Sequence, residues 1–126
     1  MERTFEAVIL IAHGARDSRW VEPFLRMQAD LAEKLRPQKV ALSFLEFTPP
    51  TFADASAEVY RGGARRILVA PIFLSGGGHV AKDVPELVRV ERERYPDATF
   101  VIGGAIGEEP EVASGMAAAV ARLARG

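Results

Sequence analysis

The sequence predicts an α/β fold in which a four-stranded parallel sheet lies between two layers of helices. Two observations predict this fold: four apolar runs alternate with four helical patterns along the 126 residues, and the runs are apolar almost throughout. Strands without polar alternation are typical of parallel sheets covered on both faces, and successive parallel strands need right-handed crossovers. We therefore expect one three-layer α/β/α sandwich over residues 1–126, with strand order 2-1-3-4.

Apolar runs rich in β-branched residues and phenylalanine define the expected strands, which are residues 5–12, 39–47, 65–74 and 98–104. The first run, "FEAVILIA", is apolar at nearly every position, as a strand buried on both faces requires. A segment with helical signals follows each run. The expected helices are residues 18–36, 51–62, 83–95 and 111–125.

Helix-starting residues support two of these helices. Thr51 with Asp54 and Asp83 with Glu86 both resemble capping boxes, in which a side chain satisfies a free N–H group at the helix start. In residues 18–36 an apolar residue recurs every three or four positions, which is the spacing of an amphipathic helix. The sequence therefore places a helix after every strand.

The composition limits the class of function. Sixteen basic and seventeen acidic residues give a net charge of -1, which argues against a nucleic-acid partner. No apolar run approaches the length of about 20 residues that a membrane span needs. The first residues are too acidic for a secretory signal, and the chain has no cysteine for disulfides or thiolate metal sites. We expect a cytoplasmic protein.

Three residues suited to metal binding follow the first three expected strands. His13 follows the first strand, Glu46 lies at the end of the second, and His79 follows the third, at a spacing of 33 positions in each case (46 − 13 and 79 − 46). The chain has no other histidine. Because ligands of such folds bind at the carboxyl ends of the strands, beside the reversal of strand order, we expect the three side chains to meet there.

Two imidazoles and one carboxylate suit a divalent transition metal such as cobalt, iron, nickel or zinc. Three protein ligands leave coordination positions open for a substrate, so such a site can hold a metal and also release it. Each residue taken singly also fits an ordinary surface role, because histidines and glutamates at strand ends are commonly solvated. The prediction of a shared site depends on their convergence at one edge.

Three glycines precede His79. Gly76, Gly77 and Gly78 place backbone N–H groups near the start of the third helix, where the helix dipole favours anions, and they leave room for a large flat ligand. Arg16 and Lys82 add positive charge at the same edge, although both also fit ordinary surface positions. If they act together, the ligand is rich in carboxylates.

These motifs resemble the class II tetrapyrrole chelatases, in particular the short CbiX-type sirohydrochlorin cobaltochelatases. The stretches that resemble the family are "LIAHGARD", "FLEF" and "PIFLSGGGHVAKDVP", of which the last is the most specific. Ala15 departs from the pattern, because the family often has a serine after His-Gly. A hydroxyl contact is therefore missing at that position, while the three metal ligands are unaffected.

The resemblance implies a chelatase-like fold and insertion of cobalt(II), or in related enzymes iron(II) or nickel(II), into sirohydrochlorin for cobalamin or sirohaem synthesis. The metal is then a substrate, and no organic cofactor is expected. His13, Glu46 and His79 would be both metal ligands and catalytic groups, with a histidine or the glutamate accepting a pyrrole proton. Arg16, Gly76, Gly77, Gly78 and Lys82 would bind the macrocycle.

Short members of the family pair as homodimers, so the resemblance also implies a second copy facing the site. The last expected helix has an apolar face that could serve either the core or that contact; its members are Val112, Met116, Val120 and Leu123.

Two alternative functions use the same residues. A non-enzymatic metal carrier would bind a divalent ion through His13, Glu46 and His79 without accelerating metal insertion. A phosphohistidine-type phosphatase would use His13 as a nucleophile, but such enzymes usually have an arginine just before that histidine, and this chain has Ala12.

Overall fold

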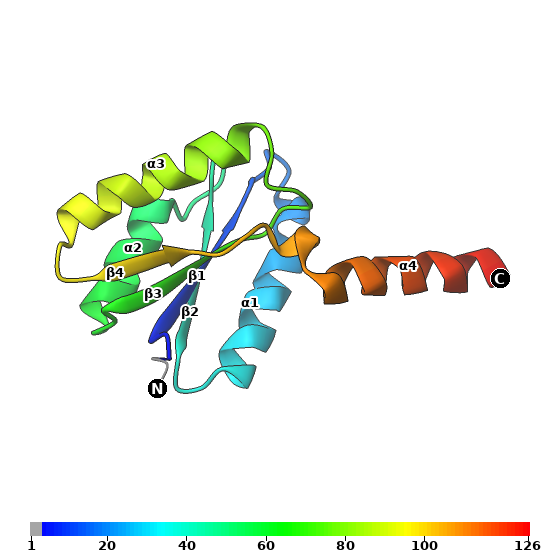
Figure 1. Ribbon diagram of the computed structural model, residues 1–126, viewed down its shortest axis with the longest axis horizontal. Helices are drawn as coiled ribbons and strands as arrows, with labels where there is room; N and C mark the ends of the chain where they lie inside the picture. The colour runs from blue at the N-terminus through cyan, green and yellow to red at the C-terminus, as the bar shows by residue number, and fades with distance from the viewer. Residues whose placement is uncertain (1–3) are drawn as a thin grey trace.

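A computed structural model describes residues 4–126, apart from the side chain of His79. Four parallel strands form one sheet in the order β2-β1-β3-β4 (Figure 1). Their bounds are β1 Ala7–Ala12, β2 Lys39–Phe44, β3 Arg66–Pro71 and β4 Thr99–Ile102. The structure confirms the predicted parallel sheet and its strand order.

The register aligns the ends of the central strands. Ala12 at the end of β1 pairs with Phe44 at the end of β2, and Ile11 pairs with Pro71 at the end of β3. The segments that follow β1, β2 and β3 therefore leave the sheet at one edge, as parallel pairing requires.

Four α-helices and two short 3₁₀ helices connect and follow the strands. The α-helices are α1 Glu22–Lys34, α2 Phe52–Arg61, α3 His79–Arg94 and α4 Pro110–Arg125, and the 3₁₀ helices are η1 Ser18–Trp20 and η2 Ile106–Glu108. Helices α2 and α3 cover one face of the sheet, and α1 covers the other (Figure 1).

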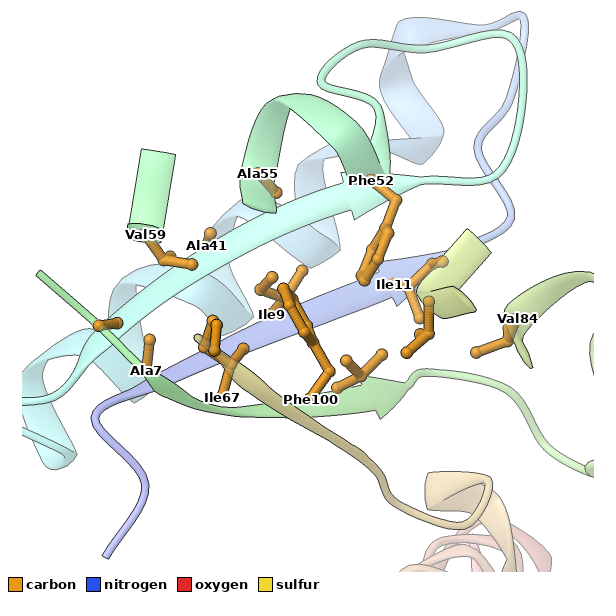
Figure 2. Close-up of a cluster of buried hydrophobic side chains, with 14 of the residues drawn as sticks. Ala7, Ile9, Ile11, Ala41, Phe52, Ala55, Val59, Ile67, Val84 and Phe100 are labelled. Atoms are coloured by element: carbon orange, nitrogen blue, oxygen red, sulfur yellow. The ribbon is translucent and has the colours of Figure 1, made fainter. Parts of the chain in front are cut away.

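Alternate residues of β1 belong to two apolar cores, one on each face of the sheet. Ile9 and Ile11 face α2 and α3, where they meet Phe52 and Phe100 in the larger core (Figure 2). Leu10 and its neighbours on the other face pack against α1. All six residues of β1 are buried, which is the physical reason for the unbroken apolar run in the sequence.

The start of α3 differs from the prediction. The helix begins at His79, four residues before the expected start at Asp83. Gly78 precedes it with φ 64°, a left-handed conformation that glycine adopts without a steric cost. Asp83 and Glu86 therefore lie within the helix, and Pro85 is also inside it. The capping box predicted at Thr51 and Asp54 is present.

Helix α4 extends away from the sheet (Figure 1). None of its residues is buried, although it carries the apolar face noted in the sequence. No helix in the described part of the chain is long and apolar enough to cross a membrane.

Candidate active site

Backbone hydrogen bonds hold His13 and Glu46 next to each other. Beyond the last pair of β1 and β2, the N–H of Leu45 donates to the carbonyl of Ala12 at 2.8 Å, and the N–H of Glu46 donates to the carbonyl of His13 at 3.1 Å. The two candidate ligands are thus a continuation of the strand pairing. Both side chains are exposed at the carboxyl edge of the sheet.

Gly14 allows the two loops to approach this closely. Its φ is 91°, and an added Cβ would lie 2.0 Å from the carbonyl oxygen of Glu46. A side chain at this position would push the Glu46 loop away from His13. The glycine of the "HG" pair is therefore required by the close approach of Glu46.

Thr48 ties the same two loops together through its hydroxyl. The hydroxyl donates to the carbonyl of Ala15 at 2.7 Å and accepts from the N–H of Ala15 at 3.3 Å. In the chelatase-like pattern a serine often stands where this chain has Ala15. Here a hydroxyl from the other loop bonds the backbone at that position.

The loop after β3 reaches His13 through Phe73. The rings of His13 and Phe73 meet edge to face, with 4.6 Å between their centroids. Phe73 is buried, and its carbonyl accepts a hydrogen bond from the N–H of Gly107 at 2.8 Å. Because Phe73 is fixed in the core, the edge-to-face contact restricts how the imidazole of His13 can turn.

A cavity of about 350 Å³ opens beside His13 and Glu46. Its lining residues are His13, Leu45, Glu46, Asp83, Glu86 and Leu87. The last three come from one face of α3, because residues three and four positions apart are neighbours on a helix. One wall thus holds the imidazole and Glu46, while the facing wall holds two more carboxylates.

Asp83 and Glu86 are the site residues that the sequence reasoning missed. The pattern assigned them to a helix cap, and the earlier start of α3 brings them to the cavity wall. Arg89 donates two hydrogen bonds to Glu86, at 2.7 and 2.9 Å, and these bonds lower the pKa of the Glu86 carboxyl below its usual value. Glu86 is therefore ionised at neutral pH.

The third predicted ligand lies outside the described side chains. The backbone of His79 begins α3 at the same edge, and the structure does not describe its imidazole. Among the described residues there is no group of three or more histidine, aspartate or glutamate side chains that could hold a metal ion. The three-ligand site of His13, Glu46 and His79 therefore stays a prediction.

The residues predicted to bind the macrocycle surround the same edge. Gly78 caps α3 without a side-chain hydrogen bond, and Gly77 donates its N–H to the Ser75 hydroxyl at 3.4 Å. The Cβ position at Gly76 lies 3.4 Å from a carboxylate oxygen of Glu108. Their role in binding a ligand also stays a prediction.

Arg16 and Lys82 are the two predicted cationic residues of this edge. Both are exposed, and Lys82 lies in the first turn of α3. The Arg16 guanidinium lies over the ring of Phe47, with its carbon atom 4.6 Å from the ring centroid.

Comparison with known sequences relates most of the chain to one family. The CbiX family model matches residues 7–123. A sirohydrochlorin cobaltochelatase from Methanocaldococcus jannaschii is 32% identical over 90 residues, which is 71% of this chain and 63% of that protein. Another from Methanococcoides burtonii is 29% identical over 99 residues, or 79% of this chain and 76% of that protein. The chain thus spans just under two thirds of the first relative.

Solved structures share the fold as well. A protein described as a cobalamin biosynthesis CbiX protein, from Marinobacter aquaeolei VT8, superposes with a TM-score of 0.83 at 26% identity, covering 95% of this chain and 98% of that one. SirB from Bacillus subtilis with Fe³⁺ gives a TM-score of 0.78 at 26% identity, covering 86% of this chain and 43% of that one. By the extent of the family match and the shared fold, the chain belongs to the CbiX family.

Proposed function

We propose that the protein inserts a divalent metal ion, cobalt(II) or iron(II), into sirohydrochlorin, with nickel(II) as a further candidate. The observation that carries the proposal is the pairing of His13 with Glu46 at the rim of a cavity whose facing wall holds Asp83 and Glu86. In a member of the CbiX family this arrangement joins an imidazole suited to binding a metal to carboxylates suited to attracting a cation. The metal is a substrate of this reaction.

The site residues divide the chemistry between binding and proton transfer. His13 and Glu46, with His79, bind the incoming ion while leaving coordination positions for the macrocycle nitrogens. As those nitrogens replace protein and water ligands, the inner pyrrole N–H protons leave, and an imidazole or the Glu46 carboxylate accepts them. Intrinsic affinity favours nickel and copper over cobalt, so supply and geometry decide which ion is inserted.

The apolar face of α4 supports a homodimer as the active form. Val120 and Leu123 on this face are 66% and 69% exposed. On the α1 side of the sheet, Leu68 of β3 and Val101 of β4 are only half-buried, whereas Phe100 on the opposite side is buried. Because α4 leads away from its own sheet (Figure 1), the α4 helix of a second copy can cover this strip.

Reciprocal exchange of α4 gives a contact near the lower size limit of specific interfaces. A helix of 16 residues is about 24 Å long and about 10 Å wide. Two exchanged helices therefore bury roughly 1,000 Å² in all, counted on both partners, which is near the lower limit for a specific interface. The B. subtilis SirB chain is more than twice as long as the part this chain matches, so a pair of these chelatase-like domains, residues 1–126 in each copy, approximates its length.

Spectrophotometry tests the proposed reaction directly. With purified protein, cobalt(II) and sirohydrochlorin, the visible band of the macrocycle should shift faster than without protein. We expect His13→Ala and Glu46→Gln to slow insertion by roughly 10²-fold or more, the range of lost acid–base or ligand groups. Glu33→Gln is the matched control, because Glu33 is an exposed carboxylate near the far end of α1, where it pairs with Arg36.

Two results would reject this assignment. One is a full insertion rate in His13→Ala. The other is wild-type protein that binds cobalt in a calorimeter but gives no rate above the protein-free reaction, which is the behaviour of a metal carrier.

A further inference from the structure

Phe47, next to Glu46, has a backbone conformation that is costly for its residue type. Its φ is 69°, and it is the only residue other than glycine with a positive φ in the described part of the chain. The N–H of Thr48 donates to the carbonyl of Glu46 at 2.8 Å, which closes a tight three-residue turn around Phe47. Strained conformations of this kind concentrate at functional sites, because the surrounding structure must hold them in place.

The turn holds a large aromatic ring in solvent beside the candidate ligands. The side chain of Phe47 is 58% exposed, although an aromatic ring of this size gains most from burial. The neighbouring Glu46 lines the cavity beside His13. Thr48 joins the turn to the His13 loop through its bonds to Ala15, so the backbone of Phe47 keeps a fixed position relative to the backbone of that loop.

Arg16 covers the Phe47 ring from the His13 loop. Its guanidinium carbon lies 4.6 Å from the ring centroid, within the range of a cation–π contact. Among the residues that the structure describes, no carboxylate lies within ion-pair distance of Arg16. The contact thus places a positive charge, without a countercharge, beside an exposed aromatic ring.

A second cavity extends the apolar surface on another side of His13. It has a volume of about 200 Å³ and is lined by His13, Gly14, Ala15, Trp20, Val21, Phe24, Phe44 and Ile72. Trp20, at its edge, is 68% exposed. Carboxylates therefore flank His13 in one cavity, and apolar and aromatic residues flank it in the other.

We propose that Phe47 is the stacking surface for the macrocycle and that Arg16 pairs with one of its peripheral carboxylates. This inference rests on the proposed chelatase function and adds Phe47 as a residue that selects its substrate: a flat conjugated ring stacks on Phe47, and its acidic rim meets Arg16, which the sequence already predicts to bind the macrocycle. A free metal ion needs neither residue. Phe47 therefore acts in binding the tetrapyrrole, and the ligands of the metal remain those named above.

Binding of metal-free sirohydrochlorin, followed by quenching of the single tryptophan, Trp20, tests the proposal without any metal insertion. We expect Phe47→Ala to raise the Kd for the macrocycle roughly tenfold, the scale of one lost aromatic contact. Phe47→Tyr keeps the ring and should bind like the wild type. In insertion assays Phe47→Ala should raise the KM for the macrocycle and leave kcat and the KM for cobalt unchanged.

Phe5 offers a matched control at the opposite edge of the sheet. Arg66 lies over the Phe5 ring at the same distance, 4.6 Å, so Phe5→Ala removes an equivalent contact away from the candidate site. Phe5→Ala should bind the macrocycle with the wild-type Kd. Arg16→Gln should weaken binding severalfold and flatten its dependence on salt between about 0.05 M and about 0.5 M, because it removes a charge from the contact.

The outcomes separate this inference from the proposed function. If the wild type inserts cobalt and Phe47→Ala binds the macrocycle as tightly as the wild type does, the stacking role is wrong and the chelatase proposal stands. An equal loss of binding in Phe5→Ala also overturns the stacking role, since the effect is then not local. If the wild type neither binds nor metallates sirohydrochlorin, both proposals fail.

Discussion

At the scale of single residues, Gly14 determines how closely the two candidate ligands approach. The carbonyl of Glu46 occupies the space that a side chain at Gly14 would need. His13 and Glu46 are consequently joined by a direct backbone hydrogen bond. The geometry of the proposed metal site therefore depends on a residue that binds nothing itself.

Gly14→Ala should destabilise the protein and impair metal insertion together. The added Cβ meets the Glu46 carbonyl, and alanine is strained at φ 91°, so we expect a loss of about 2 kcal/mol or more in the free energy of unfolding, measured by urea denaturation. Gly104→Ala is the control, because no atom lies within 4 Å of its Cβ position. A Gly14→Ala protein with wild-type stability would show that the loops can separate without cost.

At the scale of elements, two similar sequence patterns had different outcomes. Thr51 and Asp54 form a capping box at the start of α2, with hydrogen bonds of 3.1 Å in both directions. Asp83 and Glu86 have the same spacing but lie inside α3. The difference arises because α3 begins just after Gly78, before Asp83 is reached. The spacing of Asp83 and Glu86 in the sequence does not indicate which of these two positions begins the helix.

Thr51→Ala tests the contribution of the real capping box. Loss of the hydroxyl leaves the N–H of Asp54 without its partner, and caps of this kind contribute about 1 kcal/mol to the free energy of unfolding. Thr51→Ser keeps a hydroxyl and should restore most of the stability. Equal stability of the alanine and serine variants in urea denaturation would contradict the assigned role of the hydroxyl.

At the scale of the whole molecule, α4 is the helix that extends away from the sheet of its own chain (Figure 1). None of its residues is buried, and the sheet face beyond α1 is only partly covered. A lone amphipathic helix in water gains little from its own backbone hydrogen bonds, so most of its stability has to come from packing. The proposed second copy supplies that packing.

The double variant Val120→Glu with Leu123→Glu should convert a dimer to a monomer in sedimentation equilibrium, because it places charges on the proposed contact face. Ala118→Glu is the control on the opposite side of the same helix, and it should leave the dimer intact. A wild-type protein that sediments as a monomer at micromolar concentration would remove the homodimer from the proposal.

The amino-acid order alone predicts the strand order and the edge of the sheet at which His13, Glu46 and the backbone of His79 emerge. The apolar runs and the right-handed crossovers between them follow from the order of residues along the chain. Both can therefore be predicted without knowledge of any tertiary contact. Three features become visible only once the chain is folded: Asp83 and Glu86 line the cavity, Phe47 is exposed in a strained turn, and α4 leaves the sheet. These features depend on where one element meets another, and local spacing does not encode that.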